Sequence, residues 1–272
     1  MDNKSLMVAV ILTVMFVACQ SEKEQPVSEK TDDNEISNQH LVMATAWYQQ
    51  SAEMQACYYQ AFKHAKLALE KHVESDDSEK PNAVVLDIDE TLLDNSPFQV
   101  KMIRTGKPYS PEFWKEWTDK AAADALPGAL DFLNYAVQMD VDIFYISNRR
   151  TNELEATMEN MKELGFPTVE KEHILLKSET SDKTARRNIV KNSHDIILLI
   201  GDNLNDYSDF MGEREDQYGK NTLKKNKNIL GSEFIILPNP MYGDWVDALR
   251  NKAASESYDE FIRELPDLLQ SY

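Results

Sequence analysis

The sequence predicts an α/β fold in which a parallel sheet is flanked by helices. Short, largely apolar runs occupy residues 83–86, 141–146 and 196–200, and segments with helical periodicity separate them. Strands that are buried on both faces have such continuous apolar runs. Alternation of strands with helices makes parallel pairing with right-handed crossovers the default arrangement. We therefore expect helices on both faces of the sheet.

Length and composition limit the class of protein. A chain of 272 residues can form one large domain, or one domain with a small cap. Its hydrophobic fraction of 42% predicts a packed core rather than a disordered chain. The net charge of −18 argues against a nucleic-acid polymer or an anionic membrane surface as a partner. A small anionic substrate would need a local cation to offset this charge.

The first 18 residues have the features of a signal peptide. Lys4 precedes an apolar run over residues 6–18, which is too short to span a bilayer but suits a secretory signal. Residues 16–19 (FVAC) resemble a bacterial lipobox, with phenylalanine in place of the usual leucine. We expect the signal to be cleaved before Cys19 and Cys19 to be lipidated. The lipid would anchor the protein to a bacterial membrane, with the outer membrane favoured, so that it faces the periplasm or the cell surface. The alternative is an ordinary cleaved signal or an uncleaved anchor.

A tether and a helical segment follow the signal. Residues 19–39 are almost entirely polar, which predicts a disordered tether before a domain at residues 40–272. From His40 to about Val73 there is no glycine or proline, and apolar residues recur every three or four positions. This pattern predicts one long amphipathic helix, on which Cys57 is expected to pack in the core.

We expect a small, mainly helical cap formed by about residues 40–75 and 95–125. The second segment contains the aromatic cluster Phe113, Trp114 and Trp117. Such a cluster is most often core, and the alternative is a flat wall against which a ring can stack. Further helices are expected at about 129–139, 152–164, 185–191 and 257–269. Short strands are expected at 173–176 and 233–237, with a charged, irregular segment at 211–229.

Polar side chains follow three of the apolar runs. They are Asp87 and Asp89, Ser147 and Asn148, and Asp202 and Asp206. In open α/β sheets, ligands bind beyond the carboxyl ends of the strands, so these groups are expected to share one pocket with Lys183, which begins the helix before the last run. Clustered carboxylates repel one another unless a cation neutralises them. Mg²⁺ prefers carboxylates, water and phosphate, and the sequence therefore predicts a Mg²⁺ site.

Four strings carry a resemblance to a known family. VVLDIDETLLDNSPF, FYISNR, IGDNLNDYSDF and ILPNPMYGDW resemble the class C acid phosphatases of the haloacid dehalogenase (HAD) superfamily. The resemblance runs from about residue 40 to 250 and includes the lipidated start. It implies a HAD-like, Rossmann-like core. It also implies a bacterial lipoprotein that hydrolyses small-molecule phosphomonoesters, with nucleoside 5′-monophosphates favoured.

The resemblance also implies roles for individual residues. Asp87 would be the nucleophile that forms an aspartyl-phosphate, a recognised covalent route for a carboxylate. Asp89 would be the general acid for the leaving alcohol and then the base for water. The Ser147 side chain and the Asn148 backbone would bind phosphate oxygens, while Lys183 neutralises the developing charge.

The implied Mg²⁺ ligands are the Asp87 side chain, the main-chain carbonyl of Asp89, and Asp202. Asp206 is either a ligand through water or the group that orients Lys183, and the sequence leaves this open. Lys177 is a second candidate for the role of Lys183. We prefer Lys183, because it opens the helix that leads into the next strand.

For the substrate, the resemblance implies that Trp114 and Tyr242 sandwich a nucleoside base, with Trp117 left in the core. Stacking of this kind tolerates any base. Two alternatives to a hydrolase stay open: a phosphotransferase on the same fold, and a non-catalytic surface binding or storage lipoprotein. The presence of Asp87, Asp89 and Lys183 favours an enzyme. The oligomeric state stays open.

Overall fold

The computed structural model describes residues 38–75, 78–253, 255 and 257–272. The expected signal peptide at 1–18, Cys19 and nearly all of the expected tether lie outside the described residues. Within the described residues, no helix combines the length and the apolar character needed to cross a membrane.

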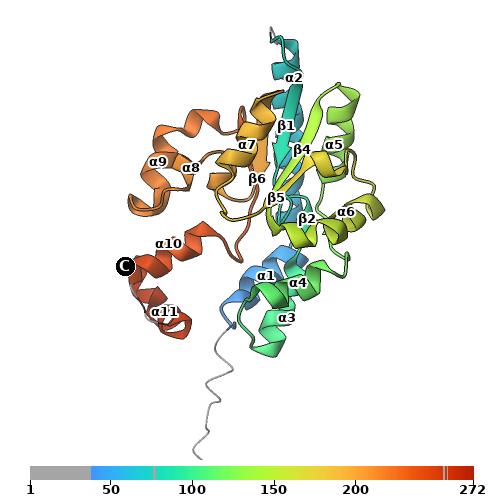
Figure 1. The fold of residues 1–272 in the computed structure, drawn as a ribbon. Helices are drawn as coiled ribbons and strands as arrows, with labels where there is room; N and C mark the ends of the chain where they lie inside the picture. Colours follow the sequence, from blue (N-terminus) through green and yellow to red (C-terminus); the bar gives the residue numbers. More distant parts are fainter. Residues whose placement is uncertain (1–37, 76–77, 254, 256) are drawn as a thin grey trace, which may run out of the picture. The chain divides into compact units, whose positions relative to one another are not determined.

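A five-stranded parallel sheet forms the centre of the fold, as the sequence predicts (Figure 1). The strand order is β5-β4-β1-β6-β7. The strands are β1 (Asn82–Leu86), β4 (Asp142–Arg150), β5 (Ile174–Lys177), β6 (Asp195–Gly201) and β7 (Phe234–Ile236). The central strand, β1, lies between β4 and β6, with Leu86 opposite both Tyr145 and Ile200. This register brings the carboxyl ends of three strands to the same edge.

The two faces of β1 pack in two separate clusters, because successive side chains point to opposite sides of a strand. Val84 and Leu86 pack in a cluster with residues of α2 (Ala52–Glu74) and α5 (Ala129–Gln138). Ala83 and Val85 pack on the other side, in a cluster that includes Val190 of α7 (Thr184–Lys191). Helices therefore cover both faces, and residues 83–86 of β1 are all apolar.

The helix expected from His40 to Val73 is two helices. The first, α1 (Leu41–Gln50), ends at Ser51, whose backbone is extended with ψ of 137°. The Ser51 side chain accepts a hydrogen bond from the backbone N–H of Met54, which makes it the N-cap of α2. Cys57 is exposed on α2, so the expectation that it packs in the core was wrong.

The segments expected to form a cap lie in two places. Helix α1 contacts α3 (Ser96–Thr105), and α4 (Pro111–Thr118) follows α3 in the chain. Helix α2 instead contacts β6, β7 and α5, so it covers the sheet. A short antiparallel pair, β2 (Leu93–Asp94) with β3 (Asp124–Ala125), closes the segment that carries α3 and α4.

Short helices fill the C-terminal part of the chain. The segment expected to be irregular holds several of them. The closing helix expected at about 257–269 is α11 followed by the turn η6, and α10, which was not expected, precedes it. The remaining elements are η1 (Thr151–Glu153), α6 (Leu154–Glu163), η2 (Lys171–His173), η3 (Leu204–Asp206), α8 (Asp209–Gly212), η4 (Gln217–Gly219), α9 (Lys220–Lys225), η5 (Lys227–Ile229), α10 (Asp244–Ala253), α11 (Tyr258–Glu264) and η6 (Leu265–Leu268).

The packing of α2 on the sheet generates a stability prediction. Leu69 is fully buried in the cluster between α2 and the sheet, whereas Leu67 on the same helix is 57% exposed. Leu69→Ala should lower the free energy of unfolding by about 2–5 kcal/mol, because it removes buried methyl groups and leaves a cavity. Leu67→Ala, the matched control, should change it by no more than about 0.5 kcal/mol. Denaturant unfolding measures both, and equal losses would contradict this packing.

Candidate active site

A cavity of about 690 Å³ opens at the carboxyl ends of β1, β4 and β6. All but one of the side chains assigned to chemistry or substrate by the sequence line it, the exception being Ser147. Those that line it are Asp87, Asp89, Trp114, Asn148, Lys183, Asp202, Asp206 and Tyr242. Segments far apart along the chain therefore meet at one pocket, as the strand pattern predicts.

Lys183 lies between two carboxylates. Its ammonium group donates a hydrogen bond to Oδ1 of Asp87 and another, of 2.7 Å, to Oδ1 of Asp206. All three side chains are buried. Asp87 is fixed because its backbone N–H donates to the carbonyl of Ile200 on β6 at 2.9 Å. Lys177 also lines the cavity, but among the described residues it is Lys183 that pairs with Asp87.

Gly201, the last residue of β6, allows Asp206 to reach this position. A Cβ atom at Gly201 would overlap the carboxyl group of Asp206. The chain turns back after the strand through η3, and Oδ2 of Asp206 accepts a hydrogen bond from the backbone N–H of Asn203 at 2.9 Å. With Oδ1 on Lys183, both carboxyl oxygens of Asp206 have a donor. This arrangement provides the lysine-orienting contact that was one of the two alternatives for Asp206.

The carboxylates outnumber the cation beside them. Burial raises the pKa of Asp87 to about 7, although Lys183 opposes the rise. Burial also raises the pKa of Asp202, and the charges of Asp206 and Asp87 add to the effect. Burial alone would lower the pKa of Lys183, but Asp206 and Asp87 raise it above its ordinary value. One ammonium group is therefore too little positive charge for this cluster.

A divalent cation fits this set of donors. Asp87, Asp202 and Asp206 each offer a carboxylate oxygen, and these oxygens lie within 4.8 Å of one another. Hard cations such as Mg²⁺ and Ca²⁺ take oxygen ligands, and a cation would favour the ionised form of each buried carboxyl group. The donor set therefore matches an oxygen-ligated divalent metal.

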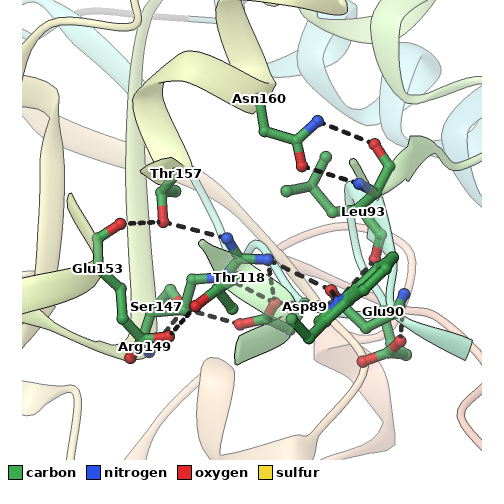
Figure 2. Close-up of polar contacts among 12 residues, drawn as sticks. Asp89, Glu90, Leu93, Thr118, Ser147, Arg149, Glu153, Thr157 and Asn160 are labelled. Carbon is green, nitrogen blue, oxygen red and sulfur yellow. Dashed lines mark hydrogen bonds and ion pairs between the residues drawn. The ribbon is translucent and has the colours of Figure 1, made fainter. Parts of the chain in front are cut away.

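Asp89 is held by several side chains (Figure 2). Its Oδ1 accepts hydrogen bonds from Asn95 Nδ2 at 2.9 Å and from Arg149 Nε at 2.9 Å, and Arg149 Nη2 lies 2.8 Å away. Its Oδ2 accepts from the hydroxyl of Ser147 at 3.1 Å. Ser147, which was expected to bind phosphate, therefore contacts Asp89 here. Asn148 lines the cavity, and its Oδ1 accepts a hydrogen bond from Arg186 at 2.7 Å.

One face of α6, with the preceding turn, supports this group. Glu153, Thr157 and Asn160 recur at helical spacing and all are buried (Figure 2). Thr157 accepts a hydrogen bond from Arg149 Nη1 at 3.0 Å, and Glu153 accepts one from the hydroxyl of Thr118 at 2.9 Å. Asn160 bonds to both the N–H and the carbonyl of Ala123, at 3.0 and 2.9 Å. The segment after α4 is thereby fixed to the core.

Sequence reasoning did not identify Arg149, Asn95 or Trp117 as part of the site. Trp117, assigned to the core, is half-buried and donates its indole N–H to Oδ1 of Asn95 at 2.8 Å. A signal for Arg149 existed in the alternation of β4. Arg149 and Ser147 are two residues apart on one strand, so their side chains point to the same face. An arginine on the inward face of a buried strand needs a partner.

The two aromatic residues assigned to the substrate both line the cavity. Trp114 packs edge-to-face on Phe98, with ring centroids 5.0 Å apart, and the guanidinium carbon of Arg149 lies 5.9 Å from its ring centroid. Tyr242 lies in the loop after β7, where its N–H donates to Asn239. Asn239 in turn donates to Oδ2 of Asp202 at 2.8 Å, which ties this loop to the carboxylate cluster.

The sequence and the fold are similar to those of known proteins. The profile of the family described as "HAD superfamily, subfamily IIIB (Acid phosphatase)" matches residues 3–245. The solved structure of the class C acid phosphatase from Bacillus anthracis is 44% identical with a TM-score of 0.81, covering 88% of this chain and 99% of that one. A second structure of that enzyme, with tungstate bound, is 43% identical over the same shares, also with a TM-score of 0.81.

Plant relatives match over a shorter part. A stem 31 kDa glycoprotein of Glycine max is 29% identical over 58% of each chain. Vegetative storage protein 1 of Arabidopsis thaliana is 26% identical over 59% of this chain and 55% of the relative. Acid phosphatase 1 of Solanum lycopersicum is 23% identical over 58% and 57%. The alignments thus span little more than half the length of these relatives. From the profile match and the similarity to the B. anthracis enzyme, this chain belongs to the class C acid phosphatases of HAD subfamily IIIB.

Proposed function

We propose that this protein is a Mg²⁺-dependent acid phosphatase that hydrolyses nucleoside 5′-monophosphates through an aspartyl-phosphate on Asp87. The observation that carries the proposal is the buried contact of Lys183 with Asp87 and Asp206, beside Asp202 in the cavity. A carboxylate, an ammonium group and a metal-ligating set are together what phosphoryl transfer requires. The B. anthracis relative has been solved with tungstate bound, and tungstate, like phosphate, is a tetrahedral oxyanion, which supports a phosphate ester as the substrate.

In the proposed reaction, a carboxylate oxygen of Asp87 attacks phosphorus, and the bond from phosphorus to the ester oxygen breaks. Asp89 gives a proton to the departing alcohol. In the second step Asp89 takes a proton from water, the water oxygen bonds to phosphorus, and the bond to Asp87 breaks, which releases phosphate. The ammonium group of Lys183 neutralises charge on the phosphoryl oxygens, and the backbone of Asn148 binds one of them.

Asp87, Asp202 and the main-chain carbonyl of Asp89 would hold the Mg²⁺. When bound, the ion supplies positive charge that lets the carboxylates and a substrate phosphate lie together. Asp206 orients Lys183 through Oδ1, and the remaining lone pairs of its carboxylate leave it able to contact the ion through a water. Lys183 rather than Lys177 is the lysine assigned to this reaction.

The nucleoside would lie between Trp114 and Tyr242. Both residues line the same cavity as the carboxylates, which supports this assignment. Phe98 holds Trp114 by its edge-to-face contact. Stacking would bind the base without selecting among bases. The remaining expectations, lipidation of Cys19 and attachment to the outer membrane, are part of this proposal and rest on the sequence motif at residues 16–19.

A non-catalytic storage role is the second candidate, and the similarity to a vegetative storage protein favours it. The buried contact of Lys183 with two carboxylates argues against it, because an ion pair in a protein interior is costly to maintain. A phosphotransferase would use the same residues with an alcohol in place of water. Product analysis with added alcohol separates transfer from hydrolysis.

Replacement of the nucleophile tests the chemistry. Asp87→Asn should lower the rate of phosphate release from p-nitrophenyl phosphate by at least about 10³-fold, because no carboxylate remains to attack phosphorus. Asp140→Asn is the matched control, since Asp140 is exposed and its φ of 58° suits asparagine. Thermal unfolding of both variants checks the fold. Turnover by Asp87→Asn close to that of the wild type would refute the covalent route.

Metal dependence is measured separately. Dialysis against a chelator should abolish turnover, and Mg²⁺ should restore it. Mg²⁺ should also raise the Tm of the stripped wild-type protein, because a ligand that binds the native state stabilises it. Asp202→Asn should lose that rise in Tm. Full activity after chelation would contradict the metal site, whereas restoration by another divalent ion alone would change only the identity of the metal.

Stacking is tested with Trp114→Ala and Tyr242→Ala. Each should raise KM for nucleoside 5′-monophosphates by about 5–150-fold, which corresponds to about 1–3 kcal/mol of lost stacking. KM for glycerol phosphate, which has no ring to stack, should change by less than about twofold. Trp114→Phe keeps an aromatic ring against Phe98 and should retain most of the affinity. Equal rises for both substrates would mean that the rings act on the phosphate pocket and not on the base.

A further inference from the structure

We propose that Arg149 is a positioning residue that fixes the carboxyl group of Asp89, so that one oxygen is held by the protein and the other faces the leaving group. The inference rests on the proposed role of Asp89 as general acid. It goes beyond that role because it assigns different tasks to the two oxygens and names the residue that separates them.

The contacts of Asp89 are unequal (Figure 2). Oδ1 accepts two hydrogen bonds of 2.9 Å, from Arg149 Nε and Asn95 Nδ2, and Arg149 Nη2 forms an ionic contact with it at 2.8 Å. Among the described residues, the hydrogen-bond partner of Oδ2 is the hydroxyl of Ser147, at 3.1 Å. Two hydrogen bonds and an ionic contact occupy Oδ1, which leaves Oδ2 as the oxygen that can face the leaving group. The hydroxyl of Ser147 can rotate, so its contact does not block Oδ2.

Arg149 can perform this task because it is itself held. Its side chain is 1% exposed. Nη1 donates to the hydroxyl of Thr157 at 3.0 Å, and Nη2 also reaches Oδ1 of Asn95 at 3.3 Å. The backbone is held by β4, and Thr157 lies on α6. The position of Asp89 is thus set by a strand and a helix of the core rather than by its own loop.

Arg149 also lies beside the region assigned to the leaving group. Its guanidinium carbon is 5.9 Å from the ring centroid of Trp114, within the range of a cation–π contact. The same side chain therefore borders the wall proposed to bind the nucleoside and holds the group proposed to protonate its 5′-oxygen.

Leaving-group sensitivity reveals whether Arg149 works through Asp89. In the first step the proton moves from Oδ2 of Asp89 to the ester oxygen as the bond from phosphorus to that oxygen breaks. An alkoxide leaves poorly without this proton, whereas p-nitrophenolate is stable as an anion. Because kcat/KM reports only the steps through transfer to Asp87, slow hydrolysis of the intermediate does not mask the effect.

Arg149→Met should lower kcat/KM for a nucleoside 5′-monophosphate by about 10²–10⁴-fold, the usual contribution of a general acid. For p-nitrophenyl phosphate the loss of kcat/KM should be less than about tenfold, because p-nitrophenolate leaves without needing a proton. Arg149→Lys replaces the bidentate guanidinium group with a single point charge. Its kcat/KM for the nucleotide should lie between those of the wild type and Arg149→Met. Arg150→Met is the matched control: Arg150 is the next residue, its side chain is exposed, and neither value should change.

Thr157→Val guards against misfolding of Arg149→Met. It keeps the guanidinium group and removes the acceptor of Nη1, together with the hydrogen bond from the Thr157 hydroxyl to the carbonyl of Glu153 within the same helical turn. It should therefore show the same substrate-selective loss at smaller size. Equal losses on both substrates in Arg149→Met, with an unchanged ratio in Thr157→Val, would overturn the proposal. If Arg149→Met does not fold, the ratio for Thr157→Val alone decides.

Asp89→Asn separates this inference from the proposed function. A selective loss in Asp89→Asn without one in the Arg149 and Thr157 variants would leave the general acid in place and refute only the role of Arg149. A lack of selectivity in Asp89→Asn would refute both. Selective losses in all three variants would support both.

Discussion

The buried ammonium group of Lys183, between Asp87 and Asp206, is the interaction on which the site depends. Removing either partner of a buried ion pair leaves an uncompensated charge, which is strongly destabilising. One ammonium group does not balance the nearby carboxylates, and burial accordingly raises the pKa of both Asp87 and Asp202. The protein therefore keeps an unfavourable concentration of negative charge where a cation and a phosphate would bind. That concentration is a stability cost accepted at a functional site.

Around this pair, the remaining contacts restrict motion rather than add charge. Gly201 leaves room for the turn that places Asp206, and Asn239 connects the Tyr242 loop to Asp202. The α6 face with Glu153, Thr157 and Asn160 attaches the segment after α4 to the core and supports Arg149 from behind. Polar groups buried this deeply are stable only when their partners are complete. These hydrogen bonds thus fix the side chains at the pocket to helices and strands of the core.

The sheet could be predicted from the sequence because strands covered on both faces are apolar throughout. The convergence of Asp87, Lys183 and Asp202 followed from topology alone, since parallel strands end at one edge. Other features depend on information that a pattern does not contain. Ser51 separates two helices within a stretch that has no glycine or proline. The pattern does not predict this break, which depends on the contact of α1 with α3. Alternation along β4 places Arg149 on the face of Ser147, but it does not identify Asp89, 60 residues away, as the partner of Arg149 until the pairing of β4 with β1 is known.

The position of β1 at the centre of the sheet has a consequence for how activity is gained and lost. Lys183 is 96 residues from Asp87 along the chain, and Arg149 is 60 residues from Asp89. Contacts between such distant segments form late and together, because closing long loops must precede them. A fragment or a partly ordered intermediate would therefore not contain the assembled pocket. Unfolding of the sheet therefore takes the whole pocket apart rather than one residue at a time.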